Sequence, residues 1–199
     1  DGPAAQEMAA IVPQLHTAYE LYRKLAGQRK VRGAIEFDTV ETKIVCNPLG
    51  RIERIEPMVR NDAHKLIEEF MLAANTCAAD FMGRSRRQGL YRIHEGPTPE
   101  KLQKLRDFLR TLGLYLEGGD EPGTEDYAKL IQSVRGRSDF EIIQTMCLRS
   151  MQQAVYSPER LGHFGLAYKS YTHFTSPIRR YPDLLTHRVI KSILQGKPY

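Results

Sequence analysis

The sequence lacks the features that mark disulfide scaffolds, zinc ribbons and membrane spans. Its three cysteines, Cys46, Cys77 and Cys147, lie far apart and form no C-x-x-C pair. An odd number of cysteines without such a pair predicts neither a disulfide framework nor a tetrahedral zinc site. No apolar run approaches the roughly 20 residues of a membrane-spanning helix, so we expect no membrane partner. Free thiols and the absence of a signal peptide favour a reducing, cytoplasmic location.

Internal repeats, low-complexity segments and linkers are also missing, which favours one continuous structural unit. The hydrophobic fraction of 41% is typical of a globular protein and excludes a disordered one. Lys and Arg outnumber Asp and Glu by 29 to 24, and the resulting net charge of +5 permits nucleic-acid binding without demanding it. The sequence begins at Asp1 and ends soon after a predicted helix, so we expect a piece of a longer chain.

The spacing of apolar residues predicts a helix-dominated α+β fold with a few short antiparallel strands. We expect helices over residues 12–27, 61–81, 98–113, 127–134, 140–154 and 178–194. Gly27 would close the first helix, and Asn61 or Asp62 would cap the second. We expect strands around 35–37, 44–46 and 52–55, a turn at 47–50, and a strand in the aromatic stretch 162–177. The predicted buried face of the second helix consists of Leu66, Phe70, Ala73, Ala74, Cys77 and Phe81.

The residues that indicate chemistry gather before and within the last predicted helix. Ser176 and Pro177 are typical of an N-cap and a first helical residue. Arg179 and Arg180 would then stand in the first turn, where free N–H groups and the helix dipole favour an anion such as phosphate. Pro182 disturbs that turn, so the alternative is a short turn separated from the main helix.

The same stretch also has structural interpretations. The two arginines can pair with a nearby acid such as Asp183 on a solvated face. The aromatic residues can stack on bases, although each is more commonly a core residue; they are Phe164, Tyr168, Tyr171, Phe174 and Tyr181. The histidines lack the spacing of metal ligands, and we expect them to be structural; they are His163, His173 and His187.

This stretch resembles the signature of the ribonuclease II and ribonuclease R family of exoribonucleases. The matching residues are His163–Leu166, Tyr171, Thr175–Pro177, the arginine pair, Tyr181, Asp183 and His187. Residues 51–79 and 91–102 resemble the ribonuclease R branch of the family, so the resemblance covers nearly the whole chain. It implies that residues 1–199 form the C-terminal portion of the catalytic domain, without the small RNA-binding β-barrels that flank it in the family.

The resemblance implies 3′-to-5′ processive hydrolysis of single-stranded RNA to nucleoside monophosphates. Arg179 matches the family's arginine that holds the phosphate at the cleavage site, which implies a catalytic role in stabilising the charge of the transition state. Arg180 is implied to contact the RNA backbone. Ser176 and Tyr181 belong to the same motif, and they either contact substrate or order the turn around Arg179.

Two further residues match substrate-binding positions of the family. Glu68 matches a glutamate that contacts the sugar at the 3′ end, with the adjacent Glu69 as the alternative. Without the resemblance, Glu68 would be read as an exposed helix residue. Phe37 aligns with an aromatic residue that clamps the terminal bases by stacking.

The family's metal site has no counterpart in this sequence. Family members use two magnesium ions held by four aspartates that end in D-x-D-D, whereas the acidic doublets here are scattered. The resemblance therefore implies magnesium in the full-length protein, no metal ligand in this chain, and no hydrolysis by the chain alone. The alternatives are a catalytically inactive RNA-binding module and a protein-interaction piece. A partner or a second copy of the chain would cover apolar surface that the missing part leaves exposed.

Overall fold

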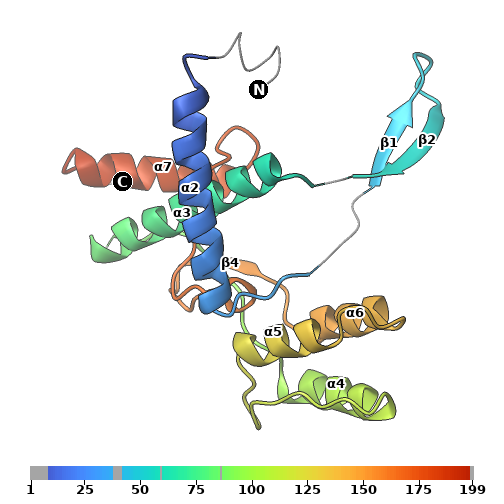
Figure 1. The fold of residues 1–199 in the computed structure, drawn as a ribbon. Helices are drawn as coiled ribbons and strands as arrows, with labels where there is room; N and C mark the ends of the chain where they lie inside the picture. The colour runs from blue at the N-terminus through green and yellow to red at the C-terminus, as the bar shows by residue number, and fades with distance from the viewer. Residues whose placement is uncertain (1–8, 38–41, 59, 86, 198–199) are drawn as a thin grey trace.

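The computed structural model describes residues 9–37, 42–58, 60–85 and 87–197. Six α-helices and two two-stranded antiparallel sheets make up these ranges, which confirms the predicted helix-dominated α+β class. In chain order the elements are α2 (Val12–Val31), β1 (Thr42–Cys46), β2 (Ile52–Pro57), α3 (Asp62–Arg84), β3 (Tyr91–Ile93), α4 (Pro99–Thr111), α5 (Thr124–Ser133), α6 (Phe140–Ser150), β4 (Val155–Ser157), the short 3₁₀ helix η1 (Phe164–Leu166) and α7 (Tyr181–Leu194) (Figure 1). Within the described ranges, no helix combines the length and the apolar character needed to span a bilayer.

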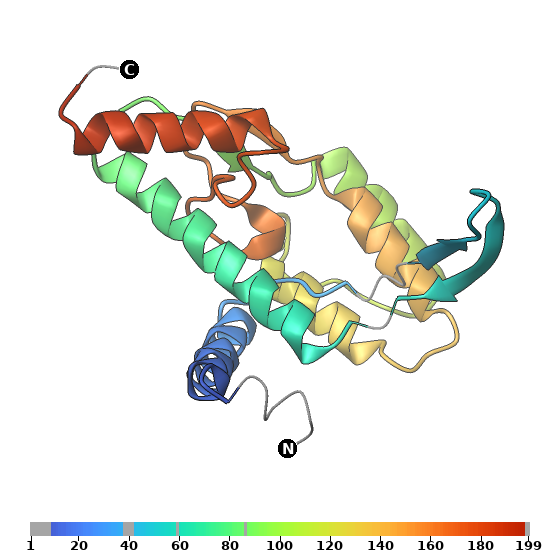
Figure 2. The same cartoon turned by 90° about the horizontal axis from the view of Figure 1, so that it is seen from above.

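The apolar interior is divided into two clusters. The first lies among α4, α5 and α6 and includes Leu109, Tyr127 and Ile143, with Phe164 of η1 packed against it. The second joins α3, β3 and α7, where Met82 and Val189 are buried together. Figures 1 and 2 show α3 and α7 side by side, α2 crossing α3, and the α4–α6 group set apart from them. The stretch between β4 and α7 connects the two clusters.

The first helix is longer than predicted, because Gly27 does not end it. α2 continues to Val31, and the residue with the left-handed backbone that follows the helix is Gly33, at φ 73°. A glycine in that conformation avoids the steric penalty that a side chain would meet, so Gly33 performs the terminating role assigned to Gly27. None of the residues of α2 is buried.

The predicted hairpin at residues 42–57 is confirmed, but the predicted strand at 35–37 is wrong. β1 pairs antiparallel with β2, and Ile44 faces Ile55 across the pair. The turn at 47–50 is fixed by Asn47, whose side-chain oxygen accepts the N–H groups of Leu49 and Arg51, each at 3.0 Å. Residues 34–37 are not in a strand, because Ile35 packs into the first core cluster and its N–H donates to the carbonyl of Gly165 at 3.2 Å.

α3 begins where predicted but buries a different face. The side-chain oxygen of Asn61 accepts the N–H of His64 at 3.2 Å, as the predicted cap requires. The buried residues of the helix are Glu69, Leu72, Asn75, Ala78, Ala79 and Met82. Cys77 and Phe81, which were predicted to be buried, are exposed. Leu66, Phe70, Ala73 and Ala74 are only partly buried. The fully buried face lies nearly opposite the predicted one, on the side where Glu69 and Asn75 pair with polar groups from elsewhere in the chain.

The other boundaries agree in part. α4 has Thr98 as its N-cap and Gly113 just beyond its end, as predicted, whereas α5 begins three residues before the predicted Tyr127. α6 ends at Ser150 instead of residue 154, because the chain continues into β4.

The long aromatic strand predicted over residues 162–177 does not form. Positive φ angles at Gly162 (86°) and Ala167 (54°) interrupt the extended backbone, and η1 lies between them. The segment is instead attached to β3, where the N–H of Arg92 donates to the carbonyl of Tyr171 at 2.9 Å. This attachment positions the residues that follow.

Candidate nucleic-acid interface

The turn that carries the arginine pair is separate from the last helix. The N–H groups of Arg179 and Arg180 donate to the carbonyl of Ser176 at 3.3 and 3.0 Å, and α7 begins afterwards at Tyr181. Ser176 is therefore not the N-cap, and Pro177 is not the first helical residue. Pro182 causes the separation, because its ring fits the start of a helix but not its interior. Arg180 is the N-cap residue of α7 and Arg179 precedes it, so neither stands in the first turn of the helix. The alternative prediction, a short turn separated from the main helix by Pro182, is confirmed.

A buried aspartate holds this turn in place. Asp183 is 0% exposed. Its Oδ1 accepts the N–H of Ser176 at 2.8 Å and Nη2 of Arg180 at 2.7 Å. Arg180 thus pairs with Asp183, as the structural interpretation predicted, although the carboxylate is buried and not solvated. The guanidinium of Arg180 therefore stabilises the turn.

Arg179, unlike Arg180, is exposed to solvent and has no carboxylate partner among the described residues. Its side chain is exposed, and among the described residues its guanidinium makes one hydrogen bond, a long contact of 3.4 Å to the Ser176 hydroxyl. The flanking Ile178 and Tyr181 are exposed as well, and Tyr181 retains 63% of its accessible surface. The turn therefore presents a cation and an aromatic ring to solvent, and these are the groups that contact phosphates and bases.

The backbone before the turn is supported by α3 and α7. Asn75 is 2% exposed, its Nδ2 donates to the hydroxyl of Tyr171 at 2.9 Å, and its Oδ1 accepts the N–H groups of Phe174 and Thr175 at 2.9 and 3.3 Å. On the other side, Nε2 of His187 donates to the carbonyl of Phe174 at 2.8 Å, and the two rings stack with centroids 4.1 Å apart. His187 is therefore structural, as predicted.

The histidines of this region are embedded in a cluster of aromatic rings. Nδ1 of His163 accepts the N–H of Leu166, and Nδ1 of His173 is hydrogen-bonded to the hydroxyl of Tyr156 at 2.6 Å. Burial lowers the pKa of His163 to about 3, assisted by the nearby His94, and burial lowers the pKa of His173 to about 4. These rings are neutral near pH 7, so they add no positive charge beside the turn.

Glu68 and Phe37 lie together at a second place, a cavity of about 370 Å³ between α2 and α3. Glu69 and Arg29 also line it. Glu68 is partly exposed there, whereas Glu69 is 4% exposed and its Oε1 accepts Nη1 of Arg29 at 2.8 Å. Of the two glutamates, Glu68 is therefore the one with accessible oxygens. Phe37 is partly buried against the first core cluster.

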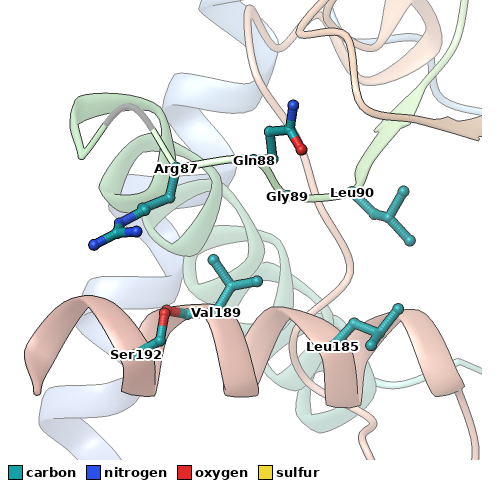
Figure 3. Close-up of a pocket in the computed structure, with 7 residues that line it drawn as sticks. All are labelled: Arg87, Gln88, Gly89, Leu90, Leu185, Val189 and Ser192. Carbon is teal, nitrogen blue, oxygen red and sulfur yellow. The ribbon is translucent and has the colours of Figure 1, made fainter. Parts of the chain in front are cut away.

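The structure thus gathers the predicted residues into two groups. Ser176, Arg179, Arg180 and Tyr181 form one, and Phe37 with Glu68 forms the other. A further groove of about 500 Å³, between residues 87–90 and α7, contains none of them (Figure 3). Sequence reasoning missed Arg29 and Asn75. A polar residue among the apolar residues of α3 was a signal for Asn75, but the sequence gives no signal that Arg29 meets Glu68.

The described residues do not form a metal site. Across 9–37, 42–58, 60–85 and 87–197, no group of three or more His, Cys, Asp or Glu side chains is arranged to hold an ion. A magnesium ion needs several closely packed oxygen ligands. The donors among the described residues therefore do not fit a two-magnesium site.

Comparison with known proteins identifies the family. The sequence matches the RNB domain over residues 1–196. It is 54% identical over 194 residues to ribonuclease R of Vibrio cholerae and 50% identical over 194 residues to ribonuclease R of Escherichia coli, in both cases covering 98% of this chain and 24% of the relative. The chain therefore spans about a quarter of the length of these relatives.

A solved structure agrees with this assignment. The structure of Mycoplasma genitalium RNase R in complex with ribose-methylated single-stranded RNA has a TM-score of 0.86 and 31% sequence identity, and the match covers 92% of this chain and 29% of that one. The predicted resemblance to ribonuclease R is confirmed. By the extent of the sequence match and the likeness of the fold, this chain belongs to the RNB domain family.

Proposed function

We propose that this chain is part of a 3′-to-5′ processive hydrolytic exoribonuclease that degrades single-stranded RNA to nucleoside monophosphates. The observation that carries the proposal is the contrast at the arginine pair. Arg180 is bonded to buried Asp183, whereas Arg179 projects from a fixed turn into solvent. A guanidinium held this way is available to a phosphate without first breaking an ion pair.

In this proposal the chain supplies the groups that grip RNA. Arg179 stabilises the charge that develops on the scissile phosphate. Tyr181, exposed two residues later, contacts a base face or the backbone, and Arg180 and Ser176 act mainly by holding the turn. Phe37 and Glu68 contact the terminal base and sugar from the cavity between α2 and α3. Contacts to phosphates, sugars and base faces carry little sequence information, which suits degradation of many RNAs.

The metal chemistry lies outside this chain in the proposal. The full-length protein would hold magnesium with carboxylates that the described residues do not provide. The 199-residue chain alone is then inactive but retains part of the RNA-binding surface. Magnesium-dependent release of nucleotides by the purified chain would contradict this division.

The test uses the full-length protein that carries this chain and a 5′-labelled single-stranded RNA, with and without magnesium. Progressive shortening from the 3′ end with release of nucleoside monophosphates is the expected result. An absence of shortening, combined with RNA binding that weakens as salt increases, would favour an inactive RNA-binding module. RNA binding that is absent at low salt would favour the protein-interaction alternative.

A further inference from the structure

The carboxylate of Glu68 is held from two sides by arginines. Its Oε1 accepts Nη1 of Arg29, which lies on α2, at 3.1 Å. Its Oε2 is bonded to Nη2 of Arg60, which precedes α3. Each oxygen of an ionised carboxylate has two lone pairs, so each can still accept a hydrogen bond from a ligand. The direction of Glu68 is therefore set before any ligand arrives.

Arg29 is in turn anchored by the neighbouring glutamate. The nitrogen that reaches Glu68 also donates to Oε1 of Glu69 at 2.8 Å, and Glu69 is 4% exposed. Burial lowers the pKa of Arg29, but the hydrogen bonds that it donates to Glu69 and Glu68 outweigh this effect and the net pKa is raised. The guanidinium stays charged, and moving it would leave a buried carboxylate without its cation. Arg29 thus connects a buried anchor to an accessible carboxylate.

We propose that Arg29 is a positioning residue that directs the Glu68 carboxylate toward the sugar of the terminal nucleotide. The inference rests on the sugar contact proposed above for Glu68. An ionised carboxylate accepts hydrogen bonds and donates none, so a fixed one favours a sugar that offers a hydroxyl proton. Arg29 would therefore support the preference for a 2′-hydroxyl over a 2′-hydrogen, which distinguishes RNA from DNA.

The conservative variant Arg29→Lys separates positioning from stability. An ammonium can still pair with buried Glu69, which protects the fold, but it lacks the planar fork of donors that bridges two carboxylates. Arg23→Lys is the matched control, because Arg23 is an exposed arginine on the same helix that lies outside the cavity. Thermal unfolding of each variant shows whether the fold is retained.

The experiment measures binding by the full-length protein, without magnesium, to two oligonucleotides. One is all RNA, and the other has 2′-deoxyribose at its terminal 3′ nucleotide. We expect Arg29→Lys and Glu68→Gln each to reduce the ratio of the two affinities about 10-fold, the order of one hydrogen bond to a charged group. We expect the double variant to reduce it no further, since both changes remove the same contact. Arg23→Lys should leave the ratio unchanged.

The outcomes separate this inference from the proposed function. An Arg29→Lys protein that folds and keeps the wild-type ratio, while Glu68→Gln loses it, overturns the positioning role alone. An Arg29→Lys protein that weakens both oligonucleotides equally also overturns it, because that is the effect of general destabilisation. Should the wild-type protein discriminate between the oligonucleotides but fail to degrade RNA with magnesium, the hydrolytic function is wrong while the inference stands.

Discussion

Arg179 and Arg180 show how two identical neighbours acquire different tasks. Arg180 is bonded to Asp183, which is 0% exposed, and both share a network with the backbone of Ser176. Arg179 extends from the same turn into solvent. The ion pair between Arg180 and Asp183 therefore fixes the turn, and the fixed turn leaves Arg179 exposed to solvent.

The first prediction concerns the anchor of this turn. Asp183→Ala removes the acceptor of two hydrogen bonds and leaves Arg180 without its carboxylate. We expect the free energy of unfolding to fall by about 3 kcal/mol, because breaking a buried ion pair strands the remaining charge. Urea unfolding measures the change, with Asp107→Ala as the control, since Asp107 pairs with Arg110 at the surface. Equal stability of the Asp183 variant and the wild type would show that the network does not stabilise the turn.

At the scale of elements, α3 supports both groups of predicted site residues. It carries Glu68 near its start, and Asn75, two turns further on, bonds the segment that leads to Arg179. Figure 2 shows α3 running beneath α7 and the irregular segment between them. A shift of this helix would therefore move both groups together.

The second prediction tests this support through Asn75. Asn75→Ala leaves the N–H groups of Phe174 and Thr175 without their acceptor. We expect a loss of about 2 kcal/mol in stability, the order of leaving buried polar groups unsatisfied. We also expect faster hydrogen exchange of those two amides. Asn75→Asp keeps the acceptor oxygen and should keep the slow exchange, so equal exchange in the alanine and aspartate variants would contradict the role of Asn75.

The elements differ in how far the sequence predicts them. The caps at Asn61 and Thr98 and the hairpin turn at 47–50 are predicted correctly, because their hydrogen bonds lie within a few residues. The predicted cap at Ser176 is wrong, because the N–H of Ser176 donates to buried Asp183 and the helix begins later. The buried face of α3 is not predicted correctly, because Glu69 and Asn75 are buried by partners 40 and 96 residues away. Periodicity counts apolar residues and gives no information on such distant polar pairs.

In the candidate site, too, the features that depend on contacts between distant residues are not predicted from the sequence. Family resemblance names Arg179, Glu68 and Phe37, and the structure shows which of them are accessible. The sequence alone did not distinguish Arg179 from Arg180, because the distinction depends on the fold of the turn. Arg29 carries no local signal, since its importance arises from a contact between two helices. Roles for these residues in RNA binding stay predictions.

At the scale of the whole molecule, a pair of histidines links the end of β3 to η1, whose Phe164 packs against the first core cluster. His94, just after β3, accepts the N–H of Gly165 at Nδ1 and donates from Nε2 to the carbonyl of Gln152 after α6. Its ring lies 4.9 Å from that of His163. Both rings are neutral in this arrangement, because each has a nitrogen that accepts an N–H.

The third prediction follows from the depressed pKa values of these histidines. Burial lowers the pKa of His94, and it lowers that of His163 to about 3, below the usual value of 6.5. The unfolded chain therefore binds protons that the folded chain rejects. The histidine contribution to stability is complete above pH 6.5 and falls between pH 6.5 and about 3. Urea unfolding at pH 7.5 and 5.0 should show a smaller difference for His163→Asn than for wild type, and an equal or larger difference would contradict this account.

Large apolar side chains remain exposed on several elements, including the β1–β2 hairpin and α2. Ile44 and Ile55 of the hairpin are 55% and 61% exposed, and α2 buries none of its residues. The expectation that a second copy or a partner covers such surface stays a prediction. α2 also carries Arg29, which lines the cavity that contains Glu68, so a partner that covers α2 would border this cavity.

The central claim, that Arg179 acts on the scissile phosphate, is tested most directly by RNA degradation with magnesium. The comparison uses full-length wild type, Arg179→Ala and the control Arg188→Ala, which changes an exposed arginine of α7. We predict that Arg179→Ala lowers kcat about 100-fold or more while RNA affinity changes little, and that Arg188→Ala stays near wild type. Equal turnover by wild type and Arg179→Ala would contradict the account and leave the exposed arginine with no role in hydrolysis.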